Sequence, residues 1–146
     1  MMKKKIIDFS NVSKLSSSLK KNNNKIVHCH GVFDLLHIGH LKHFESAKKY
    51  GDILIVSITP NKFVYKGINR PYFNEQERLE ALASIEVVDF VVLNTHPDSI
   101  HIIKKIKPHY YCKGPDYSNL ENKNSSTVGN NKNFIHEKKI CKKIGC

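Results

Sequence analysis

The fold is decided by the stretch His28-Cys29-His30-Gly31-Val32-Phe33-Asp34-Leu35-Leu36-His37-Ile38-Gly39-His40. An apolar pair leads into it, Gly31 allows the backbone to turn sharply, and the segment from His37 to His40 falls where a helix begins. A helix N-terminus attracts phosphate through its unpaired N–H groups and the positive end of its dipole. Two imidazoles three residues apart can add hydrogen-bond donors. The stretch therefore predicts a buried strand followed by a phosphate-binding turn for a nucleotide.

Apolar runs and helical periodicity alternate along the rest of the chain. Strands are predicted at 25–30, 52–57, 87–93 and 109–113. Helices are predicted after a cap at Ser10 or Asn11, over 40–50, after Asn74, up to Lys107 and over 134–144. This alternation is typical of an α/β protein. It predicts a Rossmann-like, doubly wound parallel sheet of about four strands.

Length and composition suit one domain with a real core. The chain has 146 residues, of which 40% are hydrophobic and 25% are charged. No apolar run is long enough to span a bilayer, and the lysine-rich start lacks the apolar core of a signal sequence. We therefore expect a cytoplasmic protein that has no membrane partner.

The four cysteines show neither a C-x-x-C pair nor zinc-ribbon spacing. A metal site built from Cys29 and the surrounding histidines would lack a carboxylate, and alternate strand residues face opposite ways. We expect reduced, structural thiols and no metal site.

The formal net charge of +11 would suit nucleic acid, a membrane surface or an anionic small molecule. The lysines are scattered and lack the interleaved aromatic residues that stack on bases. We therefore expect solvated helix faces in place of a nucleic-acid partner.

Residues 31–40 resemble the signature of the cytidylyltransferase-like nucleotidyltransferases, whose H-x-G-H motif is matched by residues 37–40. Heptose-1-phosphate adenylyltransferase and glycerol-3-phosphate cytidylyltransferase belong to this branch. Class I aminoacyl-tRNA synthetases share the H-I-G-H letters, but this chain is too short for one and lacks their second, lysine-rich signature. The resemblance implies a nucleotidyltransferase core over 25–117, preceded by an N-terminal helix and linker over 1–24.

The resemblance also implies roles for particular residues. Catalytic roles fall on His37, His40 and Lys42. Nucleotide-binding roles fall on Gly31, Phe33, Gly39, Arg78, Lys113, Gly114 and Asp116. Substrate-binding roles fall on Asp34, Lys66 and Arg70, the last two in a basic loop. On pattern alone, Lys42 and Arg78 are ordinary solvated side chains, and residues 113–117 form an ordinary glycine-proline turn.

Residues 118–146 depart from the family pattern. In the resembling enzymes a further strand and a serine/threonine-rich, phosphate-binding turn follow the last helix. We expect neither here, only a polar loop and a truncated C-terminal helix, so half of the phosphate site would be missing. The uncovered sheet edge raises the hypothesis of a homodimer or another covering chain.

The main hypothesis is transfer of AMP or CMP, from ATP or CTP, to a sugar phosphate or a small phosphorylated alcohol such as glycerol phosphate, with release of pyrophosphate. The nucleoside triphosphate would carry Mg²⁺ with it. One alternative is a catalytically weak nucleotide-binding or assembly module. A third reading is a nucleic-acid-binding protein, which the net charge alone would favour.

Overall fold

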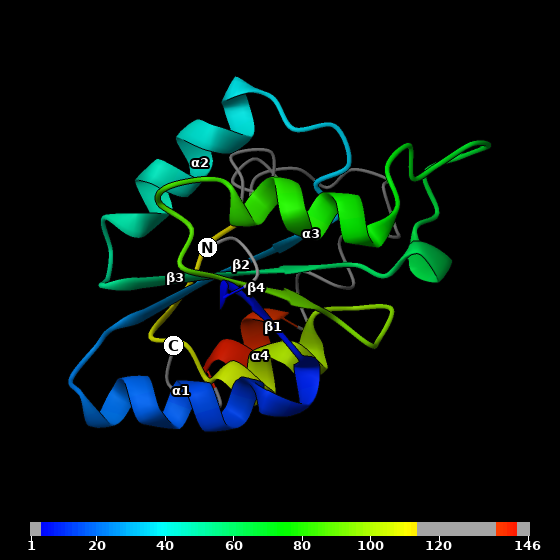
Figure 1. Cartoon of the computed structure of the whole chain (residues 1–146). Helices are drawn as coiled ribbons and strands as arrows, with labels where there is room; N and C mark the ends of the chain where they lie inside the picture. The colour runs from blue at the N-terminus through cyan, green and yellow to red at the C-terminus, as the bar shows by residue number, and fades with distance from the viewer. Residues whose placement is uncertain (1–3, 114–136, 143–146) are drawn as a thin grey trace, which may run out of the picture.

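The computed structural model describes residues 4–113 and 137–142, in which a parallel sheet lies between two layers of helices (Figure 1). The strands are β1 (Ile6–Ile7), β2 (Ile26–Gly31), β3 (Ile53–Ile58), β4 (Phe90–Leu93) and β5 (Tyr110–Tyr111). The helices are α1 (Val12–Lys21), α2 (Ile38–Lys48), α3 (Glu75–Ala83) and α4 (Ile100–Ile106), and residues 137–142 are also helical. Among the described residues, none of the helices has the length and apolar character needed to cross a bilayer.

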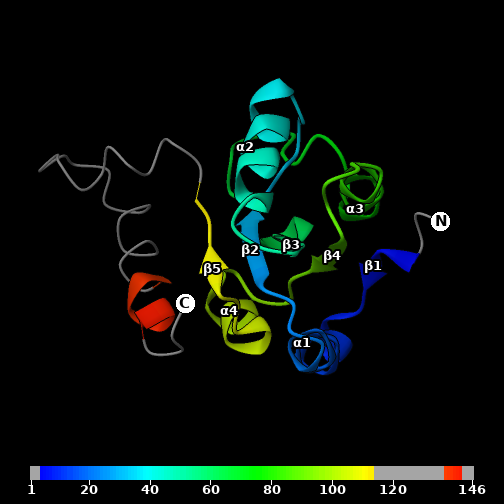
Figure 2. The same ribbon diagram turned by 90° about the vertical axis from the view of Figure 1, so that its left-hand side faces the viewer.

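The sheet has the strand order β1-β4-β3-β2-β5, and every neighbouring pair is parallel. Helices α2 and α3 cover one face, and α1 and α4 cover the other (Figure 2). This arrangement confirms the Rossmann-like, doubly wound α/β fold predicted from the sequence. After β2, the chain passes through α2 on one face of the sheet to β3. Before β5, it passes through α4 on the opposite face (Figure 2). Strands β2 and β5 therefore flank a topological switch point, where open parallel sheets bind ligands.

The structure corrects the predicted strand count. The described residues contain five strands where about four were expected, and the additional strand is β1. It pairs with β4 through Ile6 opposite Val91 and Ile7 opposite Val92. Two residues are too short to show the alternation by which a strand is predicted. The predicted polar loop after residue 117 and the end of the chain, where the family's C-terminal strand was not expected, fall on residues 114–136 and 143–146, outside the described residues.

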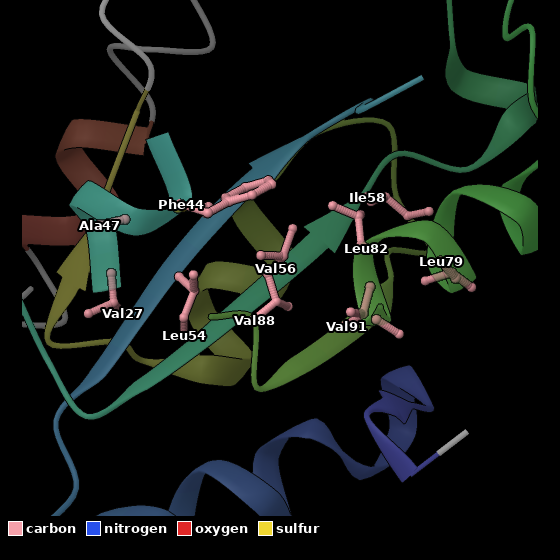
Figure 3. Close-up of a cluster of buried hydrophobic side chains, with 12 residues drawn as sticks. Val27, Phe44, Ala47, Leu54, Val56, Ile58, Leu79, Leu82, Val88 and Val91 are labelled. Atoms are coloured by element: carbon pink, nitrogen blue, oxygen red, sulfur yellow. The ribbon is translucent and has the colours of Figure 1, made fainter. Parts of the chain in front are cut away.

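A core cluster fills the space between the sheet and the helices α2 and α3 (Figure 3). Its labelled members are Val27, Phe44, Ala47, Leu54, Val56, Ile58, Leu79, Leu82, Val88 and Val91. A second cluster lies under α1 and α4 and contains Val12, Ile26, Ile55, Val92, Ile102 and Ile106. Burial on both faces explains why the central strands read as nearly continuous apolar runs.

Asp89 ties strand β3 to the segment that precedes β4. Its Oδ2 accepts the Leu54 N–H at 2.7 Å and also forms an ion pair with the Lys48 ammonium group. Since Lys48 is the last residue of α2, this carboxylate joins a helix end to the central strand pair.

Replacing Leu54 by alanine tests the central core. Leu54 is fully buried, so we expect Leu54→Ala to lower the free energy of unfolding by about 2–5 kcal/mol. Urea titration followed by circular dichroism measures the change. The matched control is Ile68→Ala, because Ile68 is 94% exposed and its loss should cost less than about 0.5 kcal/mol. Equal midpoints for the two variants would contradict this description of the core.

Candidate functional site

The first turn of α2 is capped by two histidine rings that accept hydrogen bonds from the backbone. The Gly39 N–H donates to His37 Nδ1 at 3.0 Å, and the His37 N–H donates to His40 Nδ1 at 3.3 Å. Because each Nδ1 atom accepts, each neutral ring carries its proton on Nε2. The ring centroids lie 4.1 Å apart. The helix N-terminus therefore holds two neighbouring Nε2–H donors.

Gly39 and Gly31 are needed for close packing of rings. A Cβ atom at residue 39 would lie 2.6 Å from Cε1 of His37, and one at residue 31 would lie 2.9 Å from Cζ of Phe33. The expectation that Gly31 supplies the sharp turn is corrected here, because the left-handed conformation falls on Phe33, with φ of 50°. A side chain at these two glycine positions would displace an aromatic or imidazole ring from the turn.

Phe33 supports the imidazole pair from the protein side. Its ring packs edge-on against His40, with centroids 5.6 Å apart, and against Phe44, with centroids 5.1 Å apart. A left-handed backbone at a residue with an aromatic side chain costs on the order of 1–3 kcal/mol. The contacts with Phe44 in the core offset this cost and hold the His40 ring in place.

His40 is a neutral donor at pH 7. Burial lowers its pKa from the ordinary value, and the nearby His37, His43 and Lys66 lower it further. Lys42 lies one turn into α2, where its mostly exposed side chain pairs with Glu45 at 3.5 Å. The roles predicted for these residues remain predictions.

Asp34 anchors the basic loop to the turn that follows β2. Its Oδ2 accepts the Tyr72 N–H at 2.6 Å, and its Oδ1 accepts the Phe73 N–H at 2.8 Å. The Arg70 guanidinium adds an ion pair at 3.1 Å. Burial acts to raise the pKa of Asp34, but the hydrogen bonds from Phe73, Tyr72 and Arg70 outweigh it, so the pKa lies below its ordinary value. The structure thus brings the predicted substrate residues Asp34 and Arg70 together.

Arg78 is buried, with 1% of its surface exposed. Its Nη1 donates to the carbonyl oxygens of Val32 and Thr59, both at 2.9 Å. Its Nη2 donates to Asn61 Oδ1 at 2.8 Å, and its Nε donates to the Phe73 carbonyl at 3.1 Å. The guanidinium therefore joins the turns after β2 and β3 to the loop before α3. A phosphate contact by Arg78 remains a prediction, since these groups occupy most of its donors.

Lys113 lies at the end of β5, where it forms an ion pair with Glu137 at 2.6 Å. The same carboxylate accepts hydrogen bonds from Tyr111 at 3.0 Å and from Ser99. Burial raises the pKa of Tyr111 well above its ordinary value, and the charge of Glu137 adds to this rise. The predicted nucleotide residues Gly114 and Asp116 lie outside the described residues.

Sequence reasoning missed Thr59 and Asn61, which accept hydrogen bonds from Arg78. The available signal is their position directly after β3, at the carboxyl edge, but a Thr-Pro-Asn run is equally typical of an ordinary strand end. Glu137 was missed because it meets Lys113 only through the folded chain.

The side chains near the start of α2 are hydrogen-bond donors and cations. Within residues 4–113 and 137–142, no three histidine, cysteine or acidic side chains gather in a way that could hold a metal ion. Cys29, Cys112 and Cys141 are free thiols in this part of the chain.

Asp34 makes the stability of the loop anchor depend on pH. A carboxyl with a lowered pKa in the folded state contributes stability above its unfolded pKa, and this contribution is lost as the pH falls toward the folded pKa. We expect Asp34→Asn to be less stable than the wild type at pH 7 and the difference to shrink between about pH 5 and pH 3. Urea midpoints across this range measure it. A constant difference would show that the charge of Asp34 does not act in this way.

Arg78 offers a direct choice between a structural clamp and a phosphate contact. Both Arg78→Lys and Arg78→Met should lower stability, because each leaves buried carbonyl groups without donors at about 1–3 kcal/mol apiece. Thermal unfolding and titration with a nucleoside triphosphate are measured side by side. Native stability combined with lost nucleotide affinity in Arg78→Lys would instead identify a ligand contact.

Comparison with known proteins identifies the family of the chain. The family model described as cytidylyltransferase-like matches residues 28–143. The chain is 42% identical over 111 residues to the bifunctional protein HldE of Aliarcobacter butzleri (strain RM4018), covering 75% of this chain and 23% of the relative. It is also 42% identical over 112 residues to the bifunctional protein HldE of Helicobacter pylori (strain G27), covering 75% and 24%. The chain thus spans about a quarter of the length of these relatives.

Solved structures show the same architecture. A lipopolysaccharide core biosynthesis protein from Thermoplasma volcanium GSS1 superposes with a TM-score of 0.56 at 31% identity, over 60% of this chain and 72% of that chain. A pantoate-beta-alanine ligase from Francisella tularensis, at 20% identity and a TM-score of 0.53, covers 73% of this chain and 54% of its own, and shares the fold. Residues 31–40 predicted this kinship, and the chain belongs to the cytidylyltransferase-like family.

Proposed function

We propose that this chain transfers a nucleotidyl group, AMP or CMP, from a nucleoside triphosphate to a sugar phosphate and releases pyrophosphate. The observation that carries the proposal is the pair of Nε2–H donors held at the N-terminus of α2 by the two Nδ1 hydrogen bonds. Fixed donors at a helix N-terminus are suited to a triphosphate. Membership of the cytidylyltransferase-like family supports the reaction class.

The chemistry needs no protein nucleophile. A phosphate oxygen of the acceptor attacks the α-phosphorus in line, and a new P–O bond forms there. The bond from the α-phosphorus to its bridging oxygen breaks, and pyrophosphate leaves with the electron pair. Because the acceptor phosphate is already ionised at neutral pH, no general base is required. Asp34 is then free to anchor the loop through Tyr72 and Phe73.

His37 and His40 would stabilise the charge that develops on the bridging oxygen and the departing pyrophosphate. Donors fixed by backbone hydrogen bonds need little reorganisation during the reaction, which is the main source of their catalytic value. Lys42 and Lys66 would add positive charge around the triphosphate. Mg²⁺ would enter as part of the nucleotide substrate and neutralise phosphate charge.

The acceptor class is supported by one similar solved structure and by the signature at residues 31–40. The 31% identical solved structure is a lipopolysaccharide core biosynthesis protein, and lipopolysaccharide is built largely of sugars. The signature at residues 31–40 also resembles heptose-1-phosphate adenylyltransferase. A sugar 1-phosphate with ATP is therefore the first pair to test, with CTP and glycerol 3-phosphate as the alternatives.

The His40→Asn variant tests the imidazole pair. The asparagine oxygen can still accept the His37 N–H, so the cap is kept while the Nε2–H donor is lost. We expect pyrophosphate release to fall on the order of a hundredfold with little change in melting temperature. Release is measured with ATP and CTP separately, in the presence of Mg²⁺, against sugar 1-phosphates and glycerol 3-phosphate.

The control is His109→Asn. His109 lies at the amino ends of the strands, away from the first turn of α2, and an asparagine there can still accept the Ile26 N–H. This variant should keep the wild-type rate. A wild-type rate in His40→Asn would remove the role assigned to His40. Nucleotide binding by the folded wild type without release for any pair would instead point to a binding module.

A further inference from the structure

The sheet face that is covered by α1 and α4 changes from apolar to polar along its strands. Toward the amino end it carries Ile26 and Ile55, which belong to the core cluster under these helices. Toward the carboxyl end the same face carries His28, His30 and Ser57, because alternate strand residues share a face. Buried polar groups are costly unless they are paired, so this polar half calls for an explanation.

The two histidines meet at one hydroxyl group. His28 Nε2 and His30 Nδ1 each lie 2.7 Å from Ser57 Oγ. A serine hydroxyl has a single proton, so Ser57 donates to one ring and accepts from the other. Within the described residues, Nδ1 of the fully buried His28 has no hydrogen-bond partner.

This unpartnered atom sets the direction of the chain of hydrogen bonds. If His28 carried its proton on Nδ1, a buried N–H group would be left unpaired, which is the rarer and costlier case in folded proteins. The proton therefore belongs on Nε2 of His28, which donates to Ser57. Ser57 then donates to Nδ1 of His30, and the His30 proton lies on Nε2.

Nε2 of His30 is weakly engaged by the protein. Its contact is with Thr59 Oγ1 at 3.4 Å, at the long end of the hydrogen-bond range. His30 is partly exposed, whereas His28 is fully buried, so the chain of hydrogen bonds runs from the interior toward the carboxyl edge. His30 thus lies at the carboxyl end of β2, next to β5, where the sheet has its topological switch point.

The surroundings favour an uncharged partner for this donor. Burial and the charge of Lys113 lower the pKa of His30 to about 3, and burial holds the pKa of His28 well below its ordinary value. Both rings are therefore neutral. The charge of Lys113 is balanced by Glu137. Because this ion pair carries no net charge, it adds little attraction for a phosphate, and a neutral hydroxyl group is the partner that fits the His30 donor.

We propose that His30 is a ligand-binding residue whose Nε2–H donates to a sugar hydroxyl, with Ser57 and His28 as positioning residues. This inference rests on the proposed function, because both substrates of that reaction carry a sugar: the ribose of the nucleotide and the acceptor. It places the sugar-binding donor on the β2 end, separate from the imidazole pair of α2.

The tautomers can be measured in the wild-type protein without any activity. Long-range ¹⁵N–¹H correlation spectra of the imidazole rings at pH 7 should show Nε2–H for both His28 and His30. An Nδ1–H tautomer at His30 would reverse the chain of hydrogen bonds and overturn the inference. Ser57→Ala removes the hydroxyl group that joins the two rings and leaves both imidazoles in place. In this variant, the His30 ring should no longer be held in a single tautomer.

Two substitutions of His30 separate its two nitrogen atoms. An asparagine amide reaches only the position of Nδ1, so His30→Asn keeps a partner for Ser57 and removes the edge donor. A glutamine amide extends toward the position of Nε2, so His30→Gln should partly restore the donor. We expect His30→Asn to weaken binding of one sugar-bearing ligand roughly three- to tenfold. Calorimetry is run separately with a non-hydrolysable ATP analogue and with a sugar 1-phosphate, which identifies the source of the hydroxyl.

Deoxy ligands supply the decisive comparison. Wild type should lose affinity when the contacted hydroxyl is missing, as in 2′-deoxy or 3′-deoxy nucleotides or a deoxysugar phosphate, whereas His30→Asn should bind both forms equally. If His30→Asn binds every ligand as the wild type does while pyrophosphate release persists, the inference fails and the proposed function stands. If the folded wild type binds neither substrate, both fail.

Discussion

A buried guanidinium holds together the separate turns at the carboxyl edge of the sheet. Arg78 binds carbonyl oxygens that follow β2 and β3, and it also binds the carbonyl of Phe73 just before α3. Each turn belongs to a different strand-to-helix connection, and neither the strand ladders nor the helices fix their relative heights. Burial lowers the pKa of Arg78, although the charges of Asp34 and Glu75 act against this. The carbonyl dipoles therefore stabilise a charge that is largely removed from water.

The imidazole cap depends on this edge being fixed. Val32, whose carbonyl Arg78 holds, is followed directly by Phe33, and the Phe33 ring supports His40. The atoms that begin α2 also decide its chemistry, because the Nδ1 atoms that accept backbone N–H groups leave the Nε2 protons available to a ligand. In the proposed function, helix capping and phosphate binding therefore depend on the same two imidazole rings. A change that moved the start of α2 by one residue would lose both.

Local patterns made most of the fold predictable. The strand at 25–30 and the asparagine cap of α3 are set by near neighbours, and the structure shows both, with Asn74 accepting the Glu77 N–H. Long-range contacts give no local sequence pattern from which they could be predicted. Arg78 reads as a solvated side chain because its partners lie 5 to 46 positions away. Strand β1 was not predicted because it has only two residues. Helix α2 begins at Ile38, two residues before the predicted start, because the imidazole of His37 serves as an unusual N-cap.

The net positive charge of the chain and the hydrogen-bond donors of its histidines act over different distances. A net charge of +11 attracts anions over distances of about a Debye length, roughly 8 Å at physiological salt. At contact distance, two imidazolium rings with centroids 4.1 Å apart would repel each other. Neutral rings avoid this repulsion and still donate. In the proposed function, lysines would attract the triphosphate from a distance, and neutral imidazoles would donate hydrogen bonds to it at contact.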